Sequence, residues 1–220
     1  MIAVVDYQKG NLKSVERGLI AAGGEALITA DASEIAKADA IVLPGVGAFA
    51  DAAATMCELG QMEAIRDRVR AGVPFLGICL GEHLMFEHGV EGAPEGNPAC
   101  GLGLLPGTVV AMPRRDAQGK TFKVPHVGWN TIEMPACNGS ELAFACPLFD
   151  GIAPGEYFYF THSYIAPTGS HTIAETTHST RFTSAVQFGE RAFGVQFHPE
   201  KSSDAGARVL ANFVAIAARG

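Results

Sequence analysis

The sequence predicts an α/β fold, in which a mostly parallel central sheet is flanked by helices and joined by an additional region of antiparallel strands. Between residues 2 and 79, short apolar runs alternate with helical patterns, an order that produces parallel β-α units with right-handed crossovers. From Gly107 onward, short strand candidates are separated by turn residues. Because no composition break, repeat or linker divides the chain, we expect one domain over residues 1–220.

The first half contains four apolar runs that are typical of buried strands. These runs are residues 2–5, 26–29, 40–43 and 74–78, and Pro44-Gly45 is expected to end the third. The segments between them predict a helix capped by Asn11 and ended by Gly23-Gly24, a polar helix near Ser33, and a helical stretch over residues 49–70.

The second half predicts strands and turns. Residues 91–103 have the composition of a loop, and Asp116-Ala117-Gln118-Gly119 predicts a hairpin turn whose neighbouring cations form a solvated face. Ser202 or Ser203 is expected to cap a last helix. Further strands, several of them antiparallel, are expected at residues 157–160, 172–175, 183–188 and 192–197.

The composition excludes several classes of protein. Of the 220 residues, 48% are hydrophobic and 18% are charged, which excludes a disordered or coiled-coil chain. The net charge of -7 argues against a nucleic-acid partner. The five cysteines include no CxxC pair, and they fit neither a disulfide framework nor a zinc ribbon. The sequence has neither a signal-peptide pattern nor a run of roughly 18 apolar residues, so we expect a soluble cytoplasmic protein with no membrane partner.

The clearest chemical feature is Gly77-Ile78-Cys79-Leu80-Gly81, where an apolar strand runs directly into a helical pattern. It has the form of the nucleophile elbow G-x-S-x-G with cysteine in place of serine. The two glycines permit a strained turn that lifts one side chain above the carboxyl end of the sheet, and the following helix dipole favours a thiolate. The alternative is a buried, inert cysteine after a strand.

A nucleophilic cysteine needs a base, and His198-Pro199-Glu200 offers one at the end of the last predicted strand. Residues two apart in an extended chain point to the same side, about 7 Å apart, so Glu200 can orient His198. Cys79, His198 and Glu200 therefore form a candidate catalytic triad. In another interpretation Cys79, His83 and His198 would bind a metal ion, but no carboxylate accompanies them, and we expect neither a metal nor a cofactor.

An oxyanion-binding site should accompany the nucleophile. The backbone N–H of Leu80 is one candidate donor. The segment Pro44-Gly45-Val46-Gly47 follows a neighbouring parallel strand, and loops at that edge of a sheet gather to form ligand sites. Without the elbow, the same segment would indicate only an ordinary turn between a strand and a helix.

Three motifs in this order resemble the class I glutamine amidotransferase family, and the match covers nearly the whole chain. They are PGVGAF at residues 44–49, GICLG at 77–81 and QFHPEKS at 196–202. Within the family, PHVGWN at 125–130 and YFTHSY at 159–164 are similar to the glutaminase subunits of imidazole glycerol phosphate synthases, in histidine biosynthesis, and Asp6-Tyr7 with Gly10-Asn11 agrees. Taken alone, PHVGWN would indicate only a turn followed by a buried tryptophan.

The resemblance implies a reaction and a partner. Cys79 would attack the side-chain carboxamide of L-glutamine, His198 would transfer protons, and Glu200 would orient His198. A (β/α)8-barrel cyclase subunit, bound in a heterodimer, would receive the ammonia. The residues implied to hold the oxyanion or the substrate are Gly45, Val46, Gly47, Leu80, His83, His162, Ser163 and Tyr164. Those implied to lie at the junction with the partner are His126, Trp129, Asn130, Tyr159 and Lys201.

The chain departs from the family pattern at two places. His83, preceded by Glu82, stands where the family usually has a glutamine that contacts the substrate. A neutral imidazole cannot imitate both hydrogen-bonding functions of an amide, so this departure bears on the affinity for glutamine. Gln8-Lys9 stands where glycine is usual, and it predicts a remodelled or strained loop if the backbone there needs a positive φ.

Three other functions remain open at this point. The chain could feed ammonia to a different synthase, although PHVGWN argues against this. It could be a non-catalytic binding subunit that has kept the fold, although the joint presence of Cys79, His198 and Glu200 argues against this. It could be an independent cysteine hydrolase acting on γ-glutamyl compounds, which would be active without a partner.

Overall fold

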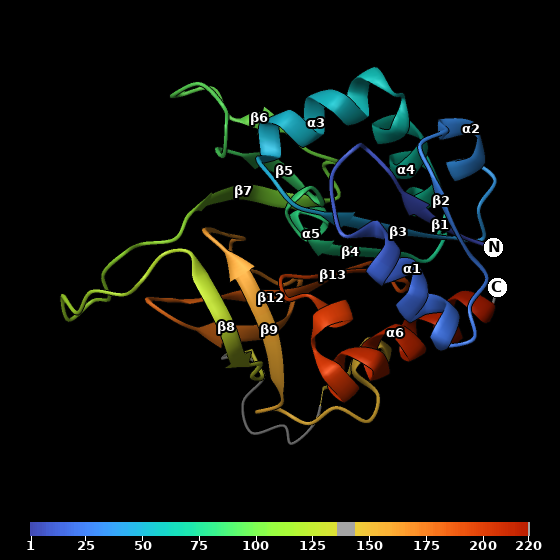
Figure 1. Ribbon diagram of the computed structural model, residues 1–220. Helices are drawn as coiled ribbons and strands as arrows, with labels where there is room; N and C mark the ends of the chain where they lie inside the picture. The colour runs from blue at the N-terminus through green and yellow to red at the C-terminus, as the bar shows by residue number, and fades with distance from the viewer. Residues whose placement is uncertain (136–143, 220) are drawn as a thin grey trace.

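A seven-stranded sheet forms the centre of the molecule (Figure 1). The computed structural model describes residues 1–135 and 144–219. Five neighbouring strands of the sheet are parallel and two strands at one edge are antiparallel, which confirms the predicted fold class. Across the sheet, the strands are β11 (Thr172–Thr177), β12 (Arg181–Phe188), β13 (Ala192–Val195), β4 (Phe75–Cys79), β3 (Ala40–Gly45), β1 (Ile2–Val5) and β2 (Ala26–Thr29).

Helices cover both faces of this sheet (Figure 1). The core is therefore divided into one hydrophobic cluster on each face of the sheet. In β1, Ile2 and Val4 pack into one cluster, and Ala3 and Val5 pack into the other. The first cluster lies under α1 (Leu12–Ala21) and α6 (Ser203–Ala218). The second lies under α2 (Ala32–Ile35), α3 (Phe49–Glu58) and α4 (Gln61–Arg70).

Four predicted elements differ in the structure. One is the strand expected at 192–197, which ends at Val195 and is followed by a 3-10 helix, Pro199–Lys201. Strand β3 does not end at residue 43, because Pro44 and Gly45 still pair with β4. A proline is tolerated there since β3 pairs with β1 only as far as Val42, which leaves one side of Pro44 without a ladder partner. The helical stretch over residues 49–70 is two helices, because Gly60 has a φ of 69°. The expected loop at 91–103 contains a short strand, β6 (Ala99–Cys100).

Loop and cap residues give a mixed result. Gln8 has a φ of 69°, so the loop that carries it is strained, as the departure from glycine predicted. Asn11 and Ser202 occupy the N-cap positions of α1 and α6, but neither side chain makes a capping hydrogen bond. Ser202 Oγ instead donates to His198 O at 2.6 Å and accepts from Tyr159 N–H at 3.0 Å.

Smaller sheets stand beside the central one. A four-stranded sheet contains β10 (Tyr164–Ile165), β7 (Leu105–Ala111), β5 (Phe86–Gly89) and β6. The pair β8 (His126–Thr131) and β9 (Tyr157–His162), here called the β8–β9 ribbon, forms a separate antiparallel unit. PHVGWN is therefore mostly strand, and Trp129 is 52% exposed rather than buried.

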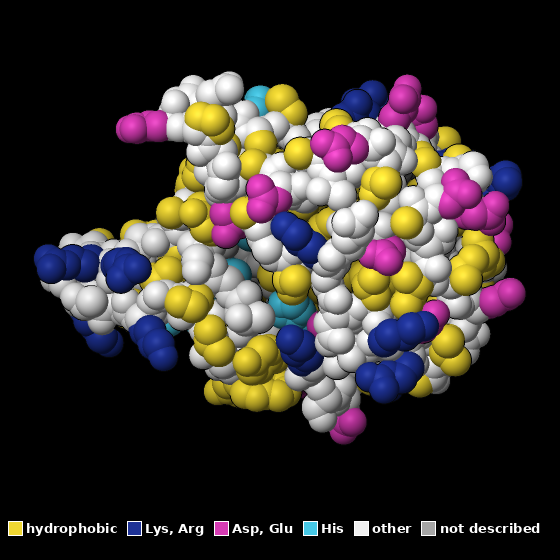
Figure 2. All heavy atoms as spheres, turned by 45° about the horizontal axis from the view of Figure 1, so that its top comes forward, with side chains coloured by type: hydrophobic (Ala, Val, Ile, Leu, Met, Phe, Trp, Pro, Cys, Tyr) yellow, Lys and Arg dark blue, Asp and Glu magenta, His cyan; other side chains and the backbone are white. Residues whose placement is uncertain are grey.

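The segment between β7 and β8 contains the predicted hairpin. Asp116 N–H donates to Lys120 O at 3.0 Å, and a bridge pairs Arg115 with Thr121. The exposed cations gathered on this projecting segment in Figure 2 are Arg114, Arg115, Lys120 and Lys123. Over residues 1–135 and 144–219, no helix has the length and apolar character to cross a membrane.

Candidate active site

Cys79 lies at a strained turn between β4 and α5 (Leu80–His83). Its φ of 54° places it among the few non-glycine residues with a left-handed backbone. Glycines on both sides make this turn possible: a Cβ on Gly81 would overlap the carbonyl oxygen of Leu43, and one on Gly77 would press into the backbone of Gly81. The predicted helix after the elbow is only one turn long. Its first residue, Leu80, has an N–H with no acceptor in its own helix.

The strands on both sides of β4 bring the other predicted residues to Cys79. Gly45 is paired directly with Cys79 across β3 and β4, so the Gly45–Gly47 segment begins beside Cys79. On the opposite side, β13 pairs Val195 with Ile78, and the chain leaves this strand toward His198. Three adjacent parallel strands therefore end at one place, the edge of a parallel sheet where ligand sites form.

His198 and Glu200 form a buried pair at this edge. His198 Nδ1–H donates to Glu200 Oε1 at 3.0 Å, and the two side chains are only 4% and 2% exposed. Burial alone would lower the pKa of His198, but the Cys79 sulfur and the Glu200 carboxylate outweigh it and raise the pKa to about 9. Among the described residues His198 Nε2 has no hydrogen-bond partner, so the imidazole holds a proton close to the sulfur without being bonded to it.

A pocket of about 370 Å³ opens over Cys79. Seven of the eight residues implied to bind oxyanion or substrate line it, and Gly45 lies just outside. The seven are Val46, Gly47, Leu80, His83, His162, Ser163 and Tyr164. Sequence reasoning missed four further lining residues, Ala48, Glu91, Pro125 and Thr161, of which Glu91 supplies the only acidic side chain in the lining. No local pattern marks Glu91, which lies in a segment predicted only as loop.

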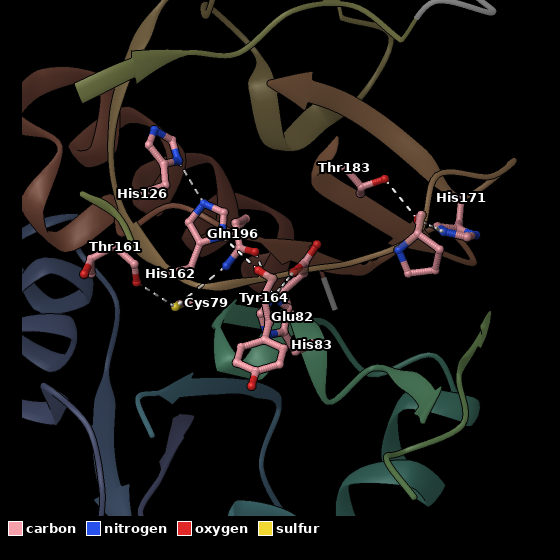
Figure 3. Close-up of polar contacts among 11 residues, drawn as sticks. Cys79, Glu82, His83, His126, Thr161, His162, Tyr164, His171, Thr183 and Gln196 are labelled. Atoms are coloured by element: carbon pink, nitrogen blue, oxygen red, sulfur yellow. Dashed lines mark hydrogen bonds and ion pairs between the residues drawn. The ribbon is translucent and has the colours of Figure 1, made fainter. Parts of the chain in front are cut away.

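Two groups contact the Cys79 sulfur (Figure 3). Thr161 O lies 3.9 Å from Sγ, where it accepts from the thiol. Gln196 Nε2 donates to Sγ across 3.8 Å. Gln196 was not predicted as a site residue, although it begins the motif that identified His198.

The two histidines of the pocket are neutral. Burial lowers the pKa of His83 to about 4, although its bond to Gln196 acts in the opposite direction. Burial also lowers the pKa of His162 well below its usual range. At neutral pH each ring therefore has one N–H and one acceptor nitrogen.

His162 belongs to a chain of hydrogen bonds whose direction follows from its end. Tyr164 O can only accept, so His162 Nδ1–H donates to it at 2.8 Å, and His162 Nε2 accepts from His126 Nδ1–H at 3.0 Å. His126 Nε2 then accepts from Asn130 Nδ2–H at 3.2 Å. Both imidazoles are therefore Nδ1–H tautomers, and the chain runs from the β8–β9 ribbon to the pocket wall.

Three of the five residues implied at the partner junction reach the surface of the β8–β9 ribbon or its neighbourhood. Trp129 packs edge-on against Tyr159, with ring centroids 6.2 Å apart, and Lys201 Nζ lies 6.0 Å from the Tyr159 ring. Asn130 and His126 lie on the opposite face of β8 from Trp129. There Asn130 Nδ2 donates to His126 Nε2 and to Thr177 O, and the His126 side chain is buried behind the ribbon.

The metal interpretation finds no support in the geometry. In the part of the chain that the structure describes, no group of three or more His, Cys, Asp and Glu side chains is placed to hold a metal ion.

Comparison with known sequences identifies the class of protein that this fold and site define. The family model "Glutamine amidotransferase class-I" matches residues 3–217. The chain belongs to the class I glutamine amidotransferase family. The elbow at Cys79 and the pair formed by His198 and Glu200 are the residues that carried the resemblance.

Curated relatives narrow this assignment. The chain is 44% identical over 214 residues to "Imidazole glycerol phosphate synthase subunit HisH" of Moorella thermoacetica, covering 96% of this chain and 93% of that protein. The protein of the same name from Aromatoleum aromaticum is 41% identical over 223 residues, covering 98% of each. Within the class I family, the chain belongs with these HisH subunits.

Solved structures share the fold at low sequence identity. A crystal structure of glutamine amidotransferase superposes with a TM-score of 0.69 at 20% identity, covering 99% of this chain and 100% of that one. The structure of PurLQS from Thermotoga maritima gives a TM-score of 0.68 at 16% identity, covering 97% of both chains. At such identities the likeness concerns the fold alone.

Proposed function

We propose that this chain is the glutaminase subunit of an imidazole glycerol phosphate synthase, which hydrolyses L-glutamine to L-glutamate and ammonia for histidine biosynthesis. One observation carries the proposal: Cys79 lies at a strained turn, with its sulfur beside the buried pair of His198 and Glu200. The names of the HisH relatives support the pathway. We place the protein in the cytoplasm as one domain over residues 1–220.

The reaction follows from the protonation states. The Cys79 thiolate attacks the carboxamide carbon of glutamine, and the protonated His198 gives its Nε2 proton to the departing ammonia. This leaves a γ-glutamyl thioester and a neutral imidazole. His198 then takes a proton from water, the resulting hydroxide attacks the thioester, and glutamate leaves as Cys79 is restored. Glu200 keeps Nδ1–H donating, so Nε2 is always the nitrogen that exchanges the proton.

The pocket suits a free amino acid. Its volume of about 370 Å³ is near the lower end of the range for small-molecule sites, about 300–1,000 Å³. Glu91 provides a negative charge for the α-ammonium group. The N–H of Leu80 and the Gly45–Gly47 segment lie on the side of Cys79 where the oxyanion would form.

A partner is required because free ammonia is mostly protonated in neutral water and is then no nucleophile. The β8–β9 ribbon offers an apolar docking surface next to the pocket: Val127, Trp129 and Tyr157 are 53%, 52% and 56% exposed. The end of the same ribbon, Thr161 and His162, lines the pocket. We place a (β/α)8-barrel cyclase subunit on this surface, in a heterodimer that carries ammonia directly to its acceptor.

Replacement of the nucleophile tests the reaction. Cys79→Ala should abolish ammonia production from glutamine by the chain reconstituted with the cyclase, whereas Cys57→Ala, on an exposed face of α3, should leave the rate unchanged. Ammonia production that survives Cys79→Ala would refute the mechanism. Full activity without the cyclase would favour an independent γ-glutamyl hydrolase, and delivery of ammonia to another acceptor enzyme would favour a different synthase.

Replacement of the exposed tryptophan tests the docking surface. A buried interface tryptophan commonly contributes at least about 2 kcal/mol, so Trp129→Ala should weaken binding of the cyclase about 30-fold or more. Leu27→Ala is the matched control, because Leu27 is 44% exposed on the edge strand β2, which is not part of the ribbon. Equal affinities of both variants for the cyclase, measured by calorimetry, would contradict this placement.

A further inference from the structure

The buried amide of Gln196 joins the nucleophile to His83 (Figure 3). The side chain of Gln196 is fully buried, its Nε2 donates to Cys79 Sγ across 3.8 Å, and its Oε1 lies 2.7 Å from His83 Nε2. The opposite orientation of the amide would direct Oε1 at the sulfur and repel a thiolate. The amide oxygen can only accept, so the proton of His83 is on Nε2.

This link carries no net charge. His83 is 3% exposed and neutral at neutral pH, and its single N–H is committed to Gln196. Gln196 in turn directs one N–H at the sulfur. Hydrogen bonds therefore run in one direction, from His83 through the amide to Cys79. They give the sulfur a hydrogen-bond donor that carries no positive charge.

Besides the imidazole of His198, two groups lie near the sulfur, and they favour opposite protonation states of Cys79. Thr161 O can only accept, so it suits a thiol that donates S–H. The N–H of Gln196 suits the lone pairs of a thiolate. A hydrogen bond to the charged form of a group stabilises that form. Loss of the Gln196 amide should therefore shift Cys79 toward the inert thiol.

We propose that Gln196, held by His83, is a positioning residue that stabilises the thiolate of Cys79 and holds its sulfur for attack. The inference rests on the proposed function only in taking Cys79 as the nucleophile. It also gives His83 a task other than that of the glutamine usual at this position in the family. His83 acts on the sulfur through Gln196, and only its Nδ1 acceptor remains for a substrate.

The rate of alkylation of Cys79 by iodoacetamide, measured against pH, tests the first link. Only a thiolate reacts, so peptide mass spectrometry of the Cys79 peptide from the full chain reports the thiolate fraction. Gln196→Leu should slow alkylation at neutral pH about 10- to 100-fold and move the profile to higher pH, as loss of one hydrogen bond to a charged group implies. An unchanged profile would overturn the proposal.

A matched control separates this effect from the general cost of removing a buried amide. Gln61 is also fully buried, and its Nε2 donates to Asp6 O at 2.9 Å and to Ala30 O at 3.0 Å. Gln61→Leu should lower stability but leave the Cys79 profile unchanged. Both variants keep the titratable groups near the sulfur, its pocket and His83, which are Tyr7, Glu82, His83, Glu91, His162, His198 and Glu200.

A double-mutant cycle tests the second link. If His83 acts through Gln196, His83→Leu should slow alkylation of Cys79 on its own but add little to Gln196→Leu. His83→Gln, which keeps an N–H donor, should stay close to the unmodified chain. Additive effects would overturn the link. So would a His83→Leu variant that has a raised KM for glutamine and an unchanged alkylation profile, because His83 would then be a direct substrate contact.

The outcome is distinguishable from a failure of the proposed function. A shifted Cys79 profile in Gln196→Leu supports the inference even if the cyclase neither binds the chain nor receives ammonia. Conversely, the unmodified chain and Gln196→Leu could show identical alkylation profiles while glutamine hydrolysis still depends on Cys79 and is stimulated by the cyclase. That result would keep the proposed function and reject the inference.

Discussion

Nδ1 of His198 lies 3.0 Å from a carboxylate oxygen of Glu200, two residues further along the chain. Both side chains are almost fully buried, so solvent does little to screen their attraction. Together with the Cys79 sulfur, Glu200 keeps the imidazole protonated at neutral pH, with a pKa of about 9. The ring is thus charged in the free enzyme, before a leaving group needs its proton.

Glu200→Gln should lower kcat for glutamine hydrolysis about 10²- to 10⁴-fold with little change in KM, because the imidazole loses its orienting charge and not its substrate contacts. The pKa of His198 should fall, since a neutral amide no longer favours the cation, and NMR titration of the ring measures this. Glu190→Gln, at an exposed turn, is the control. An unchanged His198 pKa together with an unchanged kcat would contradict the account.

Gly81→Ala should prevent the elbow from forming. The new Cβ would overlap the carbonyl oxygen of Leu43, which is backbone of a central strand and cannot move aside. We expect loss of activity and a decrease in the free energy of unfolding of about 3 kcal/mol or more. Gly18→Ala is the matched control, because Gly18 lies inside α1 and its new Cβ would meet only the end of the Leu210 side chain from α6. Urea unfolding that does not distinguish the two variants would show that the close packing is dispensable.

Glu82→Met should stabilise the protein at neutral pH. The carboxyl of Glu82 is fully buried, and burial raises its pKa well above the usual value. Neither oxygen has a hydrogen-bond partner among the described residues, and Oε2 lies 3.6 Å from His83 Nε2. Methionine fits beside Met85 and removes an unsatisfied polar group, a gain of about 1–3 kcal/mol.

The gain from Glu82→Met should depend on pH. Burial raises the pKa of Glu82 in the folded state, whereas the unfolded state ionises the carboxyl above about 4.5, so the glutamate costs stability above that pH. The advantage of the methionine variant should therefore shrink as the pH falls through about 4.5. A gain that is equal at pH 7 and pH 4 in urea unfolding would mean that burial does not raise the pKa of Glu82.

His126→Asn should reduce the sensitivity of the fold to acid. Burial, with a smaller effect from His178, lowers the pKa of His126 to about 4, while the unfolded chain binds that proton near pH 6.5. The unfolded state then binds more protons, so the contribution of this histidine to stability is lost as the pH falls from about 6.5 to 4. The asparagine variant should lose less stability over that window, whereas His88→Asn should behave like the unmodified chain. A pH-independent difference would contradict the neutral state of His126.

The candidate triad residues could be named from the sequence because their signals are local. The glycines at 77 and 81 mark the elbow. The spacing of His198 and Glu200 suggested their pairing, but the extended chain expected there was wrong: residues 199–201 form a 3-10 helix, and this helical turn brings the two side chains together. The buried strands were equally accessible, because each is a short apolar run. Breaks within elements were harder to predict from the sequence. The positive φ of Gly60, which divides two helices, depends on how α3 and α4 pack.

The environment of the sulfur was not accessible in this way. Gln196 meets Cys79 and His83 across 117 and 113 residues of sequence, and only the pairing of β13 with β4 brings them together. The burial of His126 likewise depends on the β8–β9 ribbon, which pairs two strands joined by a long connection. Such contacts are properties of the fold and leave no local pattern.

The central claim is that Cys79 attacks the γ-carbonyl of glutamine. A glutamine analogue with a diazoketone in place of the carboxamide, added to the complex with the cyclase, tests this most directly by irreversible labelling. We predict one label per chain, on the Cys79 peptide, with ammonia production falling in proportion to labelling and no label in Cys79→Ala. Inactivation with the label on another residue, or a fully labelled Cys79 in a complex that still releases ammonia from glutamine, would contradict the account.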